Sequence, residues 1–304
     1  MTAGVLDQIT NAFVTALQSG LGAVQQFSIP LLAVFAIIAF YVHVGPLVMS
    51  GIALGDAVGS VLLTVLKAGI FYWLLVNLAP MTTAAFQTFL QWGIAPTGGG
   101  VSAQTFLQPS KILDLGFRAA APIQVFIQSF TGWAAVWNQF VIFGFTLAYW
   151  MIIGAFAFVS LHLMMTIIEF HFGVLVGAIL IPWGILQPTA FLTEFSIGWI
   201  SGGLIRILIT AAMLAIGVPL FDLLAFATTS GGDPSIYSSM VMALTSGMFA
   251  WLSWIIPGRA ATIAGRGMAI GIHGGTILAG AAGGIRSVMT FTSTIRGVSG
   301  LLRR

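Results

Sequence analysis

Few residues of this chain are able to do chemistry, and the most unusual of them is Lys67. It lies at the middle of the otherwise uncharged stretch Ala57–Leu78. A cation at the centre of a bilayer costs roughly 2.5–3.5 kcal/mol, and charge inside a membrane span indicates function by default. Lys67 is therefore a candidate for the wall of a polar lumen or for an ion pair between helices. The alternative is a shifted span from which the Lys67 side chain reaches the membrane surface.

A second polar group is Glu169-x-His171, with His162 seven residues before the acid. The group invites a metal site or a proton relay. Residues two apart project to different sides of a helix, however, and no third ligand is evident. We interpret the group as a turn between two spans whose polar side chains face lipid headgroups. Glu169 stays a candidate lumen or inter-helix residue.

Arg206 and Asp222 fall in one predicted span, 16 residues apart. At 1.5 Å per residue they are about 24 Å apart along a helix, so they cannot pair with each other. The simplest interpretation places both near membrane surfaces. Because Arg206 is nevertheless a charge within a span, it joins Lys67 and Glu169 as a candidate polar residue of a lumen or helix contact.

Catalysis finds little support in the sequence. The chain has no cysteine, four histidines and seven acids. It also lacks a G-x-S-x-G elbow, an H-E-x-x-H pair and a paired aspartate motif. We therefore expect no enzymatic activity, no cofactor and no metal site.

The composition defines the class of fold. Hydrophobic residues make up 59% of the 304 residues and charged residues only 6%, with a mean hydropathy of +1.06. An average soluble protein has about 25% charged residues. The chain runs apolar for about 20 residues at a time, which fits membrane helices and not the alternating strands of a barrel. We predict an all-α polytopic membrane protein with five to seven transmembrane helices plus interfacial amphipathic helices.

Six stretches are predicted as clear spans. They are Ile29–Ser50, Ala57–Leu78, Val141–Ile168, Phe172–Leu186, Trp199–Phe226 and Tyr237–Ile256. Asp233-Pro234 is typical of a helix start and would open the last of them. With an internal C-terminus, six spans put the N-terminus inside, whereas five put it and the 79–138 loop outside.

The spans divide the chain into five segments. In 1–28, Val5, Ile9, Phe13, Leu17 and Leu21 recur at helical spacing opposite Asp7, which predicts an amphipathic helix lying in the membrane interface. The other segments are a two-helix hairpin (29–78), a large loop with an interfacial helix capped by Ser110 (79–138), the main transmembrane block (139–256) and a Gly-rich basic tail (257–304).

Two sets of residues are candidates for shaping and packing helices. Prolines remove a backbone donor, so one set predicts a broken helix or a simple helix end: Pro182, Trp183, Gly184 and Pro188. Small residues at four-residue spacing let helices approach closely, so the other set predicts oligomer packing, with a flexible tail as the alternative: Gly267, Gly271, Gly275 and Gly283.

The basic residues gather at the C-terminal end. From residue 259 onward the chain has no acid and six arginines: Arg259, Arg266, Arg286, Arg296, Arg303 and Arg304. Positively charged segments tend to remain on the cytoplasmic side of a membrane. We therefore expect a cytoplasmic C-terminus.

Two sequence elements carry a resemblance to a known family. GVLVGAILIPWGILQPTAFLTEFSIGW at 173–199 and WLSWIIPG at 251–258 resemble the TrbL/VirB-type polytopic subunits of type IV secretion and conjugation machines. The resemblance implies a structural or channel subunit of the bacterial inner membrane that forms a homo-oligomeric ring and supports pilus assembly. Implied partners are pilus subunits, VirB-type core components, secretion ATPases and, transiently, the translocated DNA or protein. It also implies a periplasmic N-terminus and large loop.

The alternative function is a small-solute channel or secondary transporter. Transporters usually show internal repeats with broken helices at matching positions. No repeat relates 29–138 to 141–256.

Overall fold

A computed structural model describes residues 4–49, 54–95, 102–229 and 234–271. The described residues form helices joined by short turns, with no strand among them. In chain order the elements are α1 (Val5–Met49), α2 (Leu54–Val76), α3 (Leu78–Ile94), α4 (Ala103–Phe106), α5 (Pro109–Ser129), α6 (Trp133–Trp137), α7 (Gln139–Leu180), η2 (Ile181–Ile185), η3 (Gln187–Thr189), α8 (Ala190–Thr229) and α9 (Ile236–Gly271).

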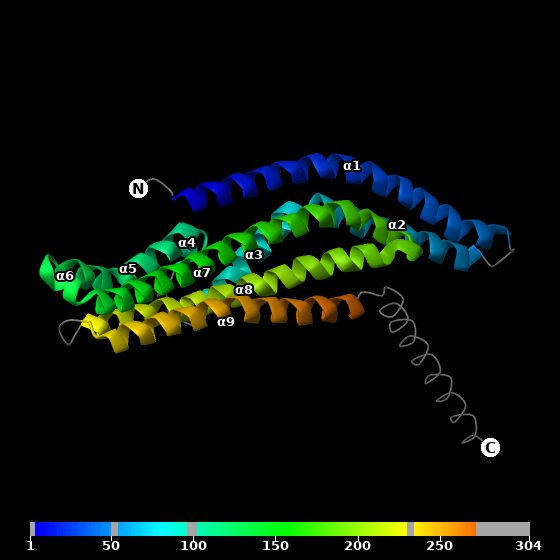
Figure 1. Ribbon diagram of the computed structural model, residues 1–304. Helices are drawn as coiled ribbons and strands as arrows, with labels where there is room; N and C mark the ends of the chain where they lie inside the picture. The colour runs from blue at the N-terminus through cyan, green and yellow to red at the C-terminus, as the bar shows by residue number, and fades with distance from the viewer. Residues whose placement is uncertain (1–3, 50–53, 96–101, 230–233, 272–304) are drawn as a thin grey trace, which may run out of the picture.

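The long helices lie side by side in an elongated bundle with α7 at its centre (Figure 1). α1 runs along one side of α7 and α2 returns beside α1, while α8 and α9 cover the opposite side. α3 packs on α8, and α5 packs on the first half of α7. The main hydrophobic core lies where α3, α5, α7, α8 and α9 meet.

The predicted fold class is confirmed. Among the described residues four helices are long and apolar enough to cross a membrane, or five if the bent pair of α2 and α3 counts as one span. The two spans predicted at Val141–Ile168 and Phe172–Leu186 are wrong as separate elements, because the single helix α7 runs through the first and on to Leu180, where η2 follows. Glu169 does not interrupt this helix, since Arg206 of α8 compensates its charge.

The length of the helices exceeds what a bilayer needs. α1 has 45 residues, α7 has 42 and α8 has 40. At 1.5 Å per residue these are about 60–68 Å long, roughly twice the 30 Å hydrocarbon core. Along the membrane normal, helices of this length would extend beyond one hydrocarbon core.

The N-terminal segment differs from the expected interfacial helix. Residues 5–49 form the single helix α1, without a break before the predicted first span. The predicted apolar stripe is divided: Leu17 and Leu21 are buried, whereas Val5 is 72% and Phe13 48% exposed, and Asp7 on the other side is 5% exposed. The carboxylate of Asp7 is buried because its Oδ1 accepts a hydrogen bond from the backbone N–H of Ser110, at 2.9 Å.

The 79–138 region is built of packed helices. α3 and α5 bury apolar faces against α8 and α7, so α5 runs alongside a long helix. Trp133 and Trp137 lie in the separate helix α6 and are 79% and 83% exposed. Ser110 is not the cap of α5, which begins one residue earlier at Pro109.

The start of α9 also lies later than the sequence suggests. The helix begins at Ile236, and the hydroxyl of Ser235 accepts a hydrogen bond from the backbone N–H of Ser238 at 3.0 Å. The Ser235 oxygen satisfies one of the free N–H groups of the first turn, while Asp233 lies outside the described residues.

Candidate functional site

The bundle has a polar junction at the middle of its length, where Glu169 of α7 and Arg206 of α8 form an ion pair. The Arg206 side chain is 23% exposed and that of Glu169 is 44% exposed. The Nη1 group of Arg206 donates to Oε2 of Glu169. The pair joins two residues that the sequence marked separately, and it links two helices at a depth where apolar side chains surround them.

The register of this pair follows from the reversal between α7 and α8. α7 ends at Leu180, and the chain turns through η2 and η3 before α8 returns antiparallel. The hydroxyl of Thr193 donates to the carbonyl oxygens of Leu180 and Ile181, at 2.8 and 3.2 Å. These bonds satisfy carbonyl groups at the end of α7, which is the condition for irregular backbone inside an apolar region.

The residues predicted to break the helix lie in this reversal. Pro182, Trp183 and Gly184 are in η2, and Pro188 is in η3. A Cβ on Gly184 would lie 2.7 Å from the Oγ1 of Thr193, so glycine permits the close approach of α8 here. The ring of Trp183 packs on that of Phe35, with centroids 4.7 Å apart, and so connects the reversal to α1.

A small cavity of about 170 Å³ adjoins the ion pair between α7, α8 and α9. Its polar lining includes Thr166, Glu169, Arg206 and Thr262. Gly202 lets α9 approach, since a Cβ there would lie 3.0 Å from the carbonyl oxygen of Ala261. The small residues thus bring three helices together around the guanidinium.

Two buried nitrogen atoms lack a hydrogen-bond partner within the described part of the chain, namely Nε of Arg206 and Nε2 of His162. An unpaired buried polar atom is costly, so the polar cavity that Arg206 lines is suited to water. No group of three or more potential metal ligands occurs in the part of the chain that the structure describes. The junction thus offers charge and hydrogen bonds between helices, without a nucleophile or a metal centre.

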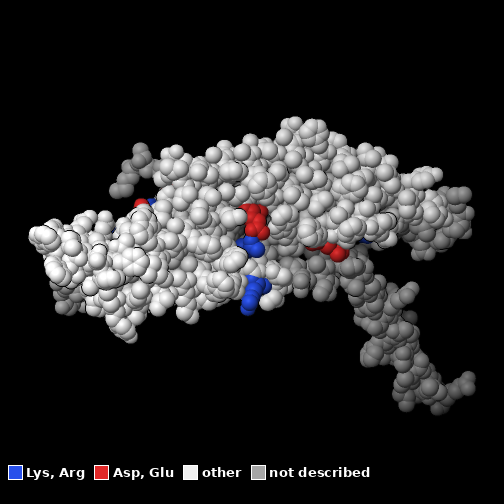
Figure 2. Space-filling model, viewed as in Figure 1, with Lys and Arg blue, Asp and Glu red and all other residues white. Residues whose placement is uncertain are grey.

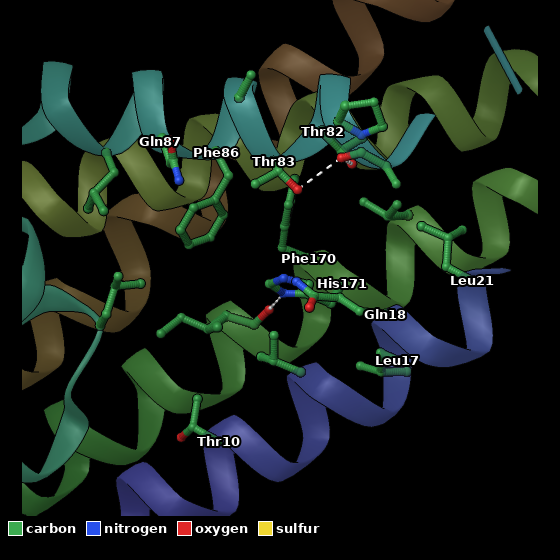
Figure 3. A pocket seen from close by; sticks show the side chains of 18 of the residues that line it. Thr10, Leu17, Gln18, Leu21, Thr82, Thr83, Phe86, Gln87, Phe170 and His171 are labelled. Atoms are coloured by element: carbon green, nitrogen blue, oxygen red, sulfur yellow. Dashed lines mark hydrogen bonds between the residues drawn. The ribbon is translucent and has the colours of Figure 1, made fainter. Parts of the chain in front are cut away.

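A larger groove, about 970 Å³ in volume, opens between α1 and α3 above α7 (Figure 3). Phe170 of α7 lies at its floor, and Leu17 and Gln18 of α1 face Phe86 and Gln87 of α3 across it. His171 projects into this groove instead of toward headgroups, and its Nδ1 donates to the carbonyl of Ile167 at 2.8 Å. The turn predicted around Glu169 and His171 is therefore wrong.

The remaining predicted residues lie away from the junction. Lys67 is on α2, which packs against α1 and η2; its side chain is partly exposed and forms no ion pair with any residue described by the structure. Gly267 and Gly271 belong to the end of α9. Gly275 and Gly283 lie outside the described residues.

Sequence reasoning missed two features of the charged residues. One is the contact of Asp7 with the start of α5. The other is the charged face of α5, which carries Lys111, Asp114 and Arg118 at spacings of three and four residues, all exposed. That spacing was visible in the sequence and predicts a polar helix face.

The charged side chains are unevenly placed on the surface. Figure 2 shows acidic and basic groups at the middle of the molecule, over α7, α8 and α9, while the end of this face that holds α6 and the starts of α7 and α9 is uncharged. Apolar side chains dominate that end, including Phe140 (84% exposed) and Phe143 (68%). Such an apolar surface is typical of contact with lipid or with another protein.

The fold and this distribution of charge define the class of protein: an integral membrane protein built of several long helices. The chain belongs to the TrbL/VirB6 plasmid conjugal transfer protein family, whose model matches residues 38–256. The resemblance predicted from the sequence is thereby confirmed, and it points to a subunit of a conjugal transfer system that works with other components. A comparison with curated proteins found no match.

Proposed function

We propose that this chain is a structural, non-enzymatic subunit of the inner-membrane complex of a type IV secretion machine, and that it acts as a homo-oligomeric ring. The observation that carries the proposal is the excess of exposed apolar surface over what a bilayer covers. The bundle is about twice as long as the hydrocarbon core is thick. Large apolar side chains are nevertheless exposed at both of its ends.

The exposed side chains illustrate this excess. At the α1–α2 end, Ile37 is 70%, Tyr41 77% and Leu62 67% exposed. At the other end, Trp150 of α7 and Met248 of α9 are 63% and 65% exposed. Lipid can cover one end only, so the other needs protein contacts. Further copies of the chain supply such contacts in a closed ring without leaving an open edge.

Orientation and partners follow from the same proposal. The six arginines from Arg259 onward hold the C-terminal end at the cytoplasmic face of the inner membrane. There they face the secretion ATPases, while the periplasmic side contacts pilus subunits and VirB-type core components. Lys67 is a candidate for the polar wall of the ring, because a partly exposed cation in an apolar helix needs water or an anionic partner.

Purification from the native host in a mild detergent tests the proposal. The tagged chain is isolated, the particle mass is measured, and the co-purifying proteins are identified. We expect a homo-oligomer accompanied by secretion ATPases or pilus subunits. A lone monomer or dimer would contradict the ring and favour the small-solute channel or transporter, which reconstituted transport assays would then examine.

A further inference from the structure

The helix α5 has one buried face and one charged face. Ile112, Ala119 and Ile123 are buried against the bundle. On the opposite side the charged residues Lys111, Asp114 and Arg118 are all exposed. Residues three and four apart lie on the same side of a helix, so these charges form one continuous stripe.

The depth of this stripe is set by α7, along which α5 runs in the antiparallel direction. A Cβ on Gly116 would lie 2.5 Å from the Cβ of Phe156. Further along, the hydroxyl of Tyr149 donates to Oε1 of Gln124 at 3.5 Å. Arg118 falls between these two contacts and therefore lies at the level of α7 between Tyr149 and Phe156.

The same level of α7 is flanked by the charge-free part of α9. Residues 236–258 of α9 contain no charged residue and are about 33 Å long, close to one hydrocarbon thickness. A Cβ on Gly144 would lie 3.1 Å from the Cδ1 of Ile236, and the rings of Phe158 and Trp254 are 6.0 Å apart. The part of α7 that contacts α5 thus lies beside a helix stretch that matches a bilayer.

The surface at this depth has two kinds of face. On α7 and α9 the large exposed side chains are apolar, for example Trp150 and Met248. On α5 the three charged side chains are exposed beside the apolar Phe117 and Val125. α8 adds the exposed Asp222 next to Phe221, whose ring packs 4.9 Å from that of Phe156. Charged side chains within a bilayer face water-filled cavities or protein, because hydrocarbon does not solvate them.

We propose that the charged face of α5, together with Asp222 of α8, lines a water-filled path through the membrane, while α7 and α9 face the lipid. This inference rests on the proposed ring, in which α5 faces the axis and copies of the chain enclose the path. The stripe and Asp222 contribute two cations and two anions. A path lined by both cations and anions stays filled with water, and it does not bind positively or negatively charged groups of a translocated chain selectively.

Single-cysteine labelling tests this assignment, and the chain is well suited to it because it has no cysteine of its own. Asp114→Cys and Arg118→Cys are made in the full chain, with Trp150→Cys and Met248→Cys as controls on the apolar faces of α7 and α9 near the level of Arg118. Native membrane vesicles are treated with a charged, membrane-impermeant methanethiosulfonate reagent. The thiolate is the reacting species and is disfavoured in apolar surroundings. We expect the α5 cysteines to react on the order of tenfold faster, or more, than the controls.

Spin labels on the same cysteines give a second measurement. Collision with a water-soluble nickel complex should dominate on α5, and collision with oxygen should dominate on α7 and α9. Protection of both α5 cysteines from the charged reagent would overturn the proposal. Frequent collision with oxygen would then indicate contact with lipid. Infrequent collision with both oxygen and the nickel complex would indicate that another protein surface covers α5. Particle mass is measured on the same samples, so water access to α5 in a monomer would contradict the ring alone.

Discussion

Arg206 of α8 and Glu169 of α7 form an ion pair at the middle of a bundle that is about twice as long as a bilayer is thick. The two helices are antiparallel, and the pair fixes their register close to the small cavity between α7, α8 and α9. Both side chains keep some exposure, so the pair is worth less than a fully buried one. Its main consequence is that a cation at position 169 would repel Arg206, and an anion at position 206 would repel Glu169.

Reversal of one charge should therefore destabilise the protein, and reversal of both should restore much of the loss. Glu169→Arg places two cations together and is expected to cost about 2 kcal/mol or more. The double variant Glu169→Arg/Arg206→Glu should recover most of it. The apparent melting temperature of the detergent-solubilised protein, followed by tryptophan fluorescence, measures the effect. If the double variant melts no higher than either single reversal, the pair does not hold the helices.

The buried carboxylate of Asp7 predicts a second outcome, since it accepts from the N–H of Ser110 at the start of α5. Asp7→Ala removes this acceptor and should cost about 1 kcal/mol, the usual value of a helix cap. Hydrogen exchange of the first turn of α5 should then become faster. Asp7→Asn keeps an acceptor oxygen and serves as the control. Equal exchange in both variants would show that the cap is unimportant.

Close backbone packing of α3 on α8 predicts a third outcome. A Cβ on Gly93 would meet the carbonyl oxygen of Leu208 and lie 2.7 Å from the Cβ of Ala211. Gly93→Ala should cost about 1–3 kcal/mol through overpacking. Gly154 of α7 has nothing within 4 Å of the same position, so Gly154→Ala is the matched control and should be neutral or stabilising by up to about 1 kcal/mol. Similar melting temperatures for both variants would contradict the close contact.

The reversal between α7 and α8 predicts a fourth outcome, at Thr193. Its side chain is 3% exposed and its hydroxyl donates to two carbonyl oxygens at the end of α7. Thr193→Val keeps the shape and removes the donor, which should cost about 1–3 kcal/mol because the carbonyls lose their partner. Thr193→Ser retains the hydroxyl and should stay closer to the wild type. Thermal melting of the three proteins distinguishes them, and identical curves would count against a role for this hydrogen bond.

The class of fold could be predicted from composition, because a chain with 6% charged residues has too little polar surface for water. The ion pair could not be predicted from the sequence, because Glu169 and Arg206 lie on opposite sides of the chain reversal between α7 and α8. Glu169 lies 17 residues before Leu186, and Arg206 lies 20 residues after it. An antiparallel reversal at Pro182–Pro188 brings such positions together. The sequence allowed a simple helix end there as well, so the register stayed open.

The buried face of α1 shows a second limit. Apolar periodicity marks the face that leaves water, which in a soluble protein is the core. In a membrane protein lipid also accepts apolar side chains, so the pattern does not tell core from lipid. Val5 and Phe13 can be exposed because lipid accepts apolar side chains, and Asp7 is buried because its carboxylate accepts a hydrogen bond from the backbone N–H of Ser110 on α5. Only the contacts of α1 with the other helices decide which of its faces is buried.

The end of α9 predicts the last outcome, which concerns assembly and not folding. Gly267 and Gly271 belong to α9, and Gly275 continues the same four-residue spacing in the sequence. Small residues at this spacing permit close contact between membrane helices, and leucine would hold them apart. Gly271→Leu together with Gly275→Leu should reduce the size of the oligomer while membrane insertion stays intact. Particle mass after mild detergent extraction measures this effect.

The matched control for assembly is Gly247→Leu, in the same helix, where nothing lies within 4 Å of an added Cβ. It adds the same bulk outside the spaced glycines and should leave the particle mass unchanged. A loss of mass in the control as well would indicate a general effect on α9. An unchanged mass in the double variant would contradict packing through these glycines and would direct the search for the contact between copies to the exposed apolar surface of α1 and α2.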